Sequence, residues 1–427
     1  MMITEHDRNR IRELASRWME IANDPVMGER KRQWTALHDL QQERPMILIE
    51  TSCIEGFLEE NELSCENTYL RGVERQMLRS IRQFEDVGDD IVIEPYYRIG
   101  WEIEEPDFGV DVEMRPGLTA EGQATLGYAV NHPLQEPEDF SKLRNRTTSV
   151  NREKTMANKQ FLENVFGDIM PVKLGNYDPL CPIEGDDEWV GMFFFALTWQ
   201  VFRFIGNDNL LFWVYDYPDA IHQLMEYMVE DRLRTFRYLE TEKLLVPNTD
   251  NQMAGPRFYG YVSDLPGPDF DGEACLKHCW GWPESQESMI ISPEMYKEFV
   301  LPYYARLSKE FGYVYYGCCE PVDDRFDMLL EAIPNLRAVS ISGWADFEFM
   351  AEKLGEKIVY SRKPTPAYMS GTNPDWDLMR EDMRKTYEAT KRNNCNTELL
   401  IRDLYTVGGD QKRLREWTDM VKATFGI

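Results

Sequence analysis

The sequence contains little histidine and little positive charge. Five histidines in 427 residues are too few for a metal site built mainly from imidazole. The 47 basic side chains are outnumbered by 75 acidic ones, which gives a formal net charge of −28 at pH 7. Such a surface repels both the phosphate backbone of nucleic acids and anionic lipid. The charge balance therefore predicts a protein that binds neither nucleic acid nor a membrane.

Long apolar runs and extracellular cysteine patterns are also missing. The longest apolar stretch, residues 190–199, is too short to cross a bilayer, and the polar residues 1–12 do not form a secretory signal. The eight cysteines are scattered, without the framework of a small disulfide-rich protein. We therefore expect a soluble cytoplasmic protein with free thiols, which are candidates for metal binding or catalysis.

Several catalytic signatures are absent as well. No Gly-x-Gly-x-x-Gly or Walker sequence follows any expected strand, which argues against a dinucleotide or nucleoside-triphosphate fold. Neither Gly-x-Ser-x-Gly nor His-Glu-x-x-His occurs, which argues against the serine-hydrolase elbow and the zinc-protease helix. The chemistry must therefore come from another arrangement of side chains.

Regular hydrophobic periodicity is present, above all from about residue 170 onward. Short apolar runs alternate with amphipathic stretches of helical period. Four or five consecutive strand–helix units require a parallel sheet with helical crossovers. We therefore predict an α/β fold, a closed (β/α)8 TIM barrel with an N-terminal helical extension. Its strands are expected at residues 44–50, 90–94, 170–174, 243–247, 313–316, 336–341, 357–361 and 398–401, and its helices include residues 191–204, 217–239, 374–392 and 411–424.

The chain divides by composition into three parts of one structural domain. Residues 1–100 are expected to form a helical lead-in joined to the barrel, residues 100–160 an irregular acidic insert, and residues 160–427 the main barrel. Within the insert, residues 101–139 hold ten carboxylates against the single cation Arg115. A net charge of −9 thus belongs to a segment that we expect to be exposed.

A barrel carries its chemistry at the carboxyl ends of its strands, and one expected strand runs into Gly317-Cys-Cys-Glu320. Thiolates are natural zinc ligands and a carboxylate can complete the set, so Cys318, Cys319 and Glu320 are candidate metal ligands. Neighbours on an extended chain point to opposite faces, so we expect only one of the two thiols at a given ion. The alternative is that both cysteines are small buried hydrophobes.

Other polar and aromatic residues gather near the expected strand ends. His278, Trp280, Trp282 and Glu284 suit a pocket that stacks a planar ligand and hydrogen-bonds its edge, or a Trp-rich loop that covers the barrel mouth. The remaining candidates are cations that could bind an anion or pair with carboxylates, a carboxylate that could act as ligand or base, and polar pocket-lining residues: Arg362, Lys363, Asp403, Asn248 and Asp250.

Three stretches together resemble a known superfamily. These are Ser292-Pro-Glu-Met-Tyr-Lys-Glu-Phe-Val-Leu-Pro-Tyr303, a strand that ends in a cysteine motif, and Ile333-Pro-Asn-Leu-Arg337. They are similar to the uroporphyrinogen decarboxylase-like superfamily, whose members are decarboxylases and cobalamin-dependent methyltransferases on a (β/α)8 barrel. The likeness extends over about residues 160–427 and is weaker before them.

The resemblance favours the methyltransferase branch. The decarboxylases carry an Arg-rich segment for a polycarboxylate, and residues 45–53 lack its arginine pair. The methyltransferase branch holds zinc through His-x-Cys-Gly, and here Tyr316 replaces the histidine while Cys318 keeps the cysteine. The corrinoid-binding signature Asp-x-His-x-x-Gly is absent, so the resemblance implies methylcobalamin on a separate corrinoid protein.

The expected function is zinc-dependent transfer of a methyl group between a small methylated substrate, such as an O-methyl aromatic, and that corrinoid protein. Two alternatives remain open: a metal-free decarboxylase or lyase that holds a carboxylate with Arg362, Lys363 and Arg402, and a non-catalytic binding protein. A homodimer is also left open. The expected catalytic residues are Glu320, Asp403 and His278, the substrate-binding residues are Trp280, Trp282, Glu284, Asn248, Asp250, Tyr316, Arg362 and Lys363, and the metal ligands are Cys318, Cys319 and Glu320.

Overall fold

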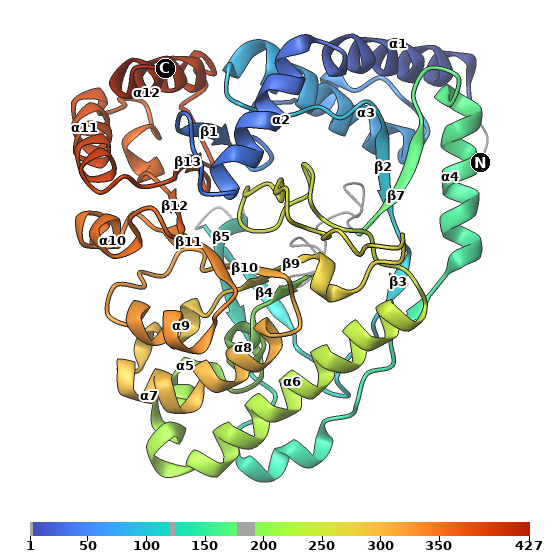
Figure 1. Cartoon of the computed structure of the whole chain (residues 1–427). Helices are drawn as coiled ribbons and strands as arrows, with labels where there is room; N and C mark the ends of the chain where they lie inside the picture. The colour runs from blue at the N-terminus through green and yellow to red at the C-terminus, as the bar shows by residue number, and fades with distance from the viewer. Residues whose placement is uncertain (1–2, 120–123, 177–192) are drawn as a thin grey trace.

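Figure 1 shows a computed structural model of the chain, in which helices surround a group of parallel strands. The structure describes residues 3–119, 124–176 and 193–427. The α-helices are α1 (Glu5–Ala22), α2 (Pro25–His38), α3 (Thr68–Arg82), α4 (Arg152–Phe166), α5 (Leu197–Asp216), α6 (Pro218–Thr241), α7 (Pro293–Phe299), α8 (Leu301–Ser308), α9 (Phe326–Ala332), α10 (Phe347–Leu354), α11 (Trp376–Arg392) and α12 (Lys412–Phe425). The strands are β1 (Met46–Ile49), β2 (Tyr97–Gly100), β3 (Ile103–Glu104), β4 (Met114–Leu118), β5 (Ala124–Val130), β6 (Ser149–Val150), β7 (Val172–Gly175), β8 (Phe194–Phe195), β9 (Trp280–Pro283), β10 (Tyr313–Tyr316), β11 (Leu336–Ile341), β12 (Val359–Arg362) and β13 (Thr397–Ile401).

Seven strands form one parallel sheet in the order β1-β13-β12-β11-β10-β9-β8. From β9 to β13 each strand pairs with the one before it in the chain, and the first strand β1 pairs with the last strand β13. Every residue of β1 and β13 is buried. Parallel strands covered on both faces need apolar side chains on both faces, which explains their continuous apolar runs. The predicted α/β fold with a parallel sheet and helical crossovers is confirmed.

The predicted closure of the barrel is not found. The strands β2 and β7 form a separate two-stranded parallel sheet, and no ladder joins it to the seven-stranded sheet in the ranges that the structure describes. The arrangement is compatible with a barrel, because the first and last strands of the large sheet are neighbours. Side-chain hydrogen bonds, described next, span the two places where a barrel would need ladders.

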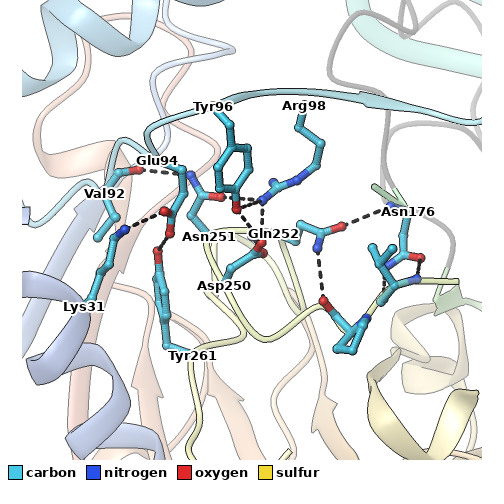
Figure 2. A network of polar contacts seen from close by, with 12 residues as sticks. Lys31, Val92, Glu94, Tyr96, Arg98, Asn176, Asp250, Asn251, Gln252 and Tyr261 are labelled. Carbon is cyan, nitrogen blue, oxygen red and sulfur yellow. Dashed lines mark hydrogen bonds and ion pairs between the residues drawn. The ribbon is translucent and has the colours of Figure 1, made fainter. Parts of the chain in front are cut away.

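Two asparagines span the gap between β7 and β9. The intervening residues 244–248 belong to no strand, so the strand predicted at 243–247 is wrong. Asn176 donates to the Val246 carbonyl and accepts from the Val246 N–H at 2.9 Å (Figure 2). Asn248 accepts from the Trp280 N–H at 2.8 Å and donates to its carbonyl at 3.1 Å. Amide side chains thus take the place of a backbone ladder.

Two buried aspartates serve the other gap, between β1 and β2. The carboxylate of Asp90 accepts from the Ile47 N–H, and the carboxylate of Asp89 accepts from the Ile49 N–H, both at 2.9 Å. The Asp90 N–H donates back to the Ile47 carbonyl at 2.8 Å. The edge of β1 is therefore satisfied without a neighbouring strand, and burial raises the pKa of Asp89 to about 6. The strand predicted at residues 90–94 is replaced by this contact.

The insert is more regular than the sequence predicted. Strands β4 and β5 form an antiparallel hairpin, β3 and β6 form a second antiparallel pair, and helix α4 begins at Arg152. The helix predicted at 191–204 begins at Leu197 as α5, and residues 191–192 of that prediction lie outside the described residues. Within the described ranges, no helix combines the length and the apolar character needed to cross a bilayer.

Alternation along the parallel strands divides their side chains between two regions. On β13, Leu399 and Ile401 pack with α11 and α12, whereas Leu400 packs with the buried aromatic residues Trp280 and Tyr315 of the central region. Because successive side chains point to opposite faces, Glu398 and Arg402 fall on the same inner face as Leu400. The inner face therefore carries charged groups at both ends of β13.

Replacing Asn248 with alanine tests the bridge between β7 and β9. The change leaves the buried N–H and carbonyl of Trp280 without their partner, and each buried unsatisfied group costs roughly 1–3 kcal/mol. We expect the free energy of unfolding, measured by urea denaturation, to fall by about 2–5 kcal/mol. The control Asn164→Ala, at an exposed position of α4, should change it by less than about 0.5 kcal/mol. If both changes lower the free energy of unfolding equally, the stabilising role of the Asn248 bridge is contradicted.

Candidate active site

The turn after β10 brings two thiols together. Gly317 has φ +97°, and a side chain at this position would meet the Ser340 Cβ at 3.2 Å, so the turn requires glycine. The chain leaves the extended conformation there, and the Cys318 and Cys319 Sγ atoms lie 3.6 Å apart. The expectation that only one thiol faces a given point is therefore wrong, because strict alternation ends where the strand ends.

Arg402 and Asp403 follow β13 and meet these thiols. The Arg402 Nη1 donates to Cys318 Sγ at 3.1 Å, and Cys319 Sγ donates to Asp403 Oδ2 at 3.5 Å. The Arg402 Nε lies 3.2 Å from Asp403 Oδ2 and 3.7 Å from Glu50 Oε2. Burial works against the charge of Arg402, but Cys318, Glu50 and Asp403 raise its pKa. Asp403 has φ +56°, a left-handed conformation that aspartate tolerates better than most residues.

Lys363 reaches the same place from the end of β12. Its amine is buried and donates to the Ser361 Oγ at 2.6 Å and to the Tyr315 hydroxyl. Burial lowers the pKa of Lys363 to about 7, against the raising effect of the Glu398 carboxylate. In the part of the chain that the structure describes, it forms no ion pair with a carboxylate within 4 Å.

These groups line one cavity of about 170 Å³, which we call the thiol cavity. The Trp344 indole at the cavity is 79% exposed, while Arg402 and Lys363 are buried. The residues that line it are Cys318, Cys319, Ser342, Gly343, Trp344, Lys363, Pro364, Thr365, Pro366, Arg402 and Asp403. Five of the residues singled out from the sequence are thus brought together from three strand ends: Cys318, Cys319, Lys363, Arg402 and Asp403.

Arg402 also lines a second, polar cavity of about 250 Å³. This polar cavity contains Trp282, Arg98 and Arg257 among its lining residues. The Arg98 guanidinium pairs with Asp250 Oδ2 at 2.6 Å, and the Tyr96 hydroxyl donates to the same oxygen at 2.9 Å (Figure 2). Asp250 is therefore held by two partners at the edge of the polar cavity and does not lie at the thiol cavity.

The carboxylates near the end of β9 are buried in the wall of the site. Glu320 accepts from the Ser285 N–H at 2.9 Å and from the Cys318 N–H at 3.0 Å, so its two oxygens fix the turn that carries the thiols. Burial and the nearby Glu287 and Glu320 raise the pKa of Glu284. Burial raises the pKa of Glu287 to about 7, and it also raises the pKa of Glu320 above its usual value. The expected roles of Glu320 as metal ligand and catalyst receive no geometric support.

The patch predicted around His278 does not form one pocket. His278 lies before β9, where its ring contacts Phe270 and accepts from the Cys275 N–H at 3.1 Å. Trp280 is fully buried and donates to the Gly260 carbonyl at 3.0 Å. Trp282, two positions further along β9, lines the polar cavity. Because His278, Trp280 and Trp282 lie at different heights along the chain that forms β9, they do not face one ligand together.

Two further candidates point away from the cavities. The Tyr316 hydroxyl contacts Ser285 Oγ at 2.6 Å and the Tyr296 hydroxyl at 2.7 Å, in the layer between the sheet and the helices. Arg362 pairs with Asp382 of α11 at 2.9 Å and donates to the Ser342 carbonyl. Both residues occupy outward positions, one residue away from the inward Tyr315 and Lys363, which shows how one step along a strand reverses the face.

The sequence interpretation missed a buried polar chain behind Lys363. Ser361 donates to the Glu398 carboxylate, and Glu398 Oε2 lies 3.7 Å from His38 Nε2. Glu398 and His38 are both fully buried. A carboxylate inside the apolar run of β13 was the available signal, because a buried charge without a partner is costly.

The expected zinc set does not fit this geometry. Thiols 3.6 Å apart could contact one ion, but the Arg402 guanidinium donates to Cys318 and Glu320 is held by backbone N–H groups. Among the described residues, no group of three or more His, Cys, Asp or Glu side chains could hold a metal ion. The positive charge that faces the Cys318 sulfur is supplied by arginine.

Comparison with known proteins finds matches only among solved structures. No family model matches the chain, and no curated protein matches it. Among solved structures, a methyltransferase from Methanosarcina mazei is similar, with 8% sequence identity and a TM-score of 0.48. The similarity covers 92% of this chain and 98% of that chain.

The pKa of Glu287 predicts a pH dependence of stability. Burial raises this pKa from 4.5 to about 7 in the folded state, so the folded form keeps a proton that the unfolded chain releases. The contribution of Glu287 to the free energy of unfolding is fully present below about pH 4.5. It falls as the pH rises to about 7, with a slope on the order of 1 kcal/mol per pH unit. Thermal unfolding across this range should show a smaller slope for Glu287→Gln. The exposed control Glu294→Gln should keep the slope of the unmodified protein, and a slope unchanged in both variants would contradict the assignment.

Proposed function

We propose that the chain is a methyltransferase that moves a methyl group between a small methylated substrate in the thiol cavity and a corrinoid carried by a separate protein. The observation that carries the proposal is the pair of thiols, Cys318 and Cys319, that face one cavity beside Arg402. The resemblance of residues 292–337 to the methyltransferase branch of the uroporphyrinogen decarboxylase-like superfamily supports it. Zinc is not part of this proposal, because the donor set does not fit it.

The residues at the cavity suit the stabilisation of negative charge. A heteroatom that gives up its methyl group gains an electron pair, and fixed positive groups in a buried site stabilise that charge more than water does. Arg402 stays protonated, and Lys363, with a pKa of about 7, holds or releases a proton near neutral pH. Asp403 accepts from the Cys319 thiol and keeps it oriented. When bound to its carrier protein, the corrinoid would supply the methyl-carrying cobalt.

The outer surface suits a separate carrier protein. The Trp344 indole is 79% exposed at the thiol cavity and presents an apolar face to an incoming partner. A net charge of −28 would steer a carrier with a basic patch toward this chain and would repel an acidic one. An O-methyl aromatic substrate is retained as the proposed substrate class, and its methoxy oxygen would face Arg402 and Lys363.

Arginine replacement tests the proposal. Purified protein is mixed with free cob(I)alamin and a panel of methoxybenzoates and methylated amines, and formation of methylcobalamin is followed by absorbance. We expect turnover with at least one compound, and a loss of about 10²–10³-fold in kcat/KM for Arg402→Gln, the size typical of a lost charge-stabilising donor. The matched control Arg380→Gln, at a position of α11 where the side chain is 58% exposed, should keep full activity. Full activity of Arg402→Gln would contradict the proposed role.

Cysteine replacement separates the two thiols from the other cysteines. Cys318→Ala removes the sulfur that accepts from Arg402, so we expect a similar loss in the same assay. Cys395→Ala removes a buried thiol that contacts only the Ala351 carbonyl among its hydrogen-bond partners in the described chain, and it should retain turnover. Circular dichroism of both variants checks that each has folded. Equal activity of the two variants would show that the thiols are structural.

A further inference from the structure

The amine of Lys363 is a buried polar group of the thiol cavity. It follows the end of β12, and its hydrogen-bond partners among the described residues are oxygens that carry no charge: the hydroxyls of Tyr315 and Ser361 and, at 3.5 Å, the Ser361 carbonyl. A structural lysine in a protein interior is usually neutralised by a carboxylate in direct contact. This one instead faces a cavity of about 170 Å³.

Behind the amine lies a chain of polar groups from three further elements. The Tyr315 hydroxyl of β10 and Ser361 Oγ lie 2.9 Å apart, and Ser361 donates to Glu398 of β13. Glu398 Oε2 faces His38 Nε2 of α2 at 3.7 Å, and neither atom has a hydrogen-bond partner in the described parts of the chain. The chain links the cavity to the interior through groups that exchange protons.

Arg402 lines the same cavity and remains charged. A guanidinium beside a buried amine is the arrangement that suits a ligand with both a carboxylate and a carbonyl group, because arginine matches the planar carboxylate and the amine is a nucleophile. Burial is the main effect that works against protonation of Lys363; the Arg402 charge adds to it, while the Glu398 carboxylate supports protonation.

We propose that Lys363 is a reactive amine that condenses with the carbonyl group of a small 2-oxo acid, whose carboxylate is held by Arg402. In the step, the Lys363 nitrogen attacks the carbonyl carbon and forms a C–N bond, and the carbonyl oxygen takes up a proton through the Tyr315 and Ser361 hydroxyls. The carbinolamine then loses its oxygen as water, and the second amine proton leaves with that water, which gives the imine. No oxidant, metal or methyl carrier takes part.

This activity is distinct from methyl transfer. An imine makes the 2-oxo acid an electron sink, which serves decarboxylation, proton exchange or carbon–carbon bond cleavage next to the former carbonyl. The proposal therefore does not rest on the corrinoid or on the two thiols. It stands on the burial of the amine, its uncharged contacts and the arginine that shares its cavity.

Reductive trapping on the unmodified protein tests the proposal. Protein is incubated with pyruvate and sodium cyanoborohydride, digested and mapped by mass spectrometry. We expect the reduced adduct on Lys363 to form at least tenfold faster than on exposed lysines such as Lys309. Labelling of Lys363 at or below the rate of the exposed lysines would overturn the proposal, and this readout does not depend on a variant that folds.

Comparison of two carbonyl probes tests the role of the arginine. For Arg402→Gln, trapping of pyruvate at Lys363 should fall at least tenfold relative to the unmodified protein, whereas trapping of acetaldehyde, which has no carboxylate, should change less than threefold. Equal losses for both probes would overturn carboxylate binding by Arg402. The control Arg380→Gln should trap both probes at the unmodified rates.

The pH profile of trapping tests the buried chain. The groups that face the amine are Tyr315, Ser361, Glu398, Arg402 and the thiols Cys318 and Cys319. Only the neutral amine attacks, so the acetaldehyde trapping rate should rise with pH and level off above about 7. Glu398→Gln removes the carboxylate that supports protonation, so its rate should level off at lower pH. If the midpoint of the pH profile of trapping is the same in Glu398→Gln as in the unmodified protein, the proposed effect of Glu398 on the amine is contradicted.

Discussion

The burial of parallel strands on both faces is the constraint from which the rest of the structure follows. Every residue of β1 and β13 is buried, so any polar group on these strands must find its partner inside the protein. Asp89 and Asp90 satisfy the free edge of β1, and Asn248 satisfies the backbone N–H and carbonyl of Trp280 in β9. These side chains bond to backbone groups of β1 and β9 that no neighbouring strand satisfies in the described parts of the chain.

The same constraint shapes the candidate active site. Arg402 is buried at the end of β13 and lines both cavities. Its charge faces the carboxylates of Glu50 and Asp403, and it donates a hydrogen bond to the Cys318 sulfur. The positive charge that faces the Cys318 sulfur is the Arg402 guanidinium. Burial lowers the pKa of Lys363, and the Arg402 charge lowers it further. The Glu398 carboxylate, which Ser361 connects to Lys363, works in the opposite direction. The charges of Arg402 and Lys363 and the thiols of Cys318 and Cys319 therefore influence one another.

Strand ends were a useful guide because the carboxyl ends of parallel strands meet at one edge of a sheet. Cys318, Cys319, Lys363 and Asp403 were singled out for this reason, and the structure brings them to one cavity. The guide failed where it ignored the face of the strand. Tyr316 and Arg362 also lie near strand ends, but their side chains point outward to Tyr296 and Asp382. His278 and Trp280 lie before or at the start of β9, too far from its carboxyl end.

The sequence by itself determined most of the alternation of helices and strands from residue 290 onward and several helix starts, because these depend on local propensity and on periods of 3.6 and 2 residues. The helix predicted at 374–392 and α11 (Trp376–Arg392) are the same element. Only the tertiary structure decided which polar groups meet. Arg402 reaches Cys318 across 84 residues of sequence, and Ser361 reaches Glu398 across 37. Such partnerships depend on strand order, on register and on the left-handed turns at Gly317 and Asp403, which hydrophobic periodicity does not encode.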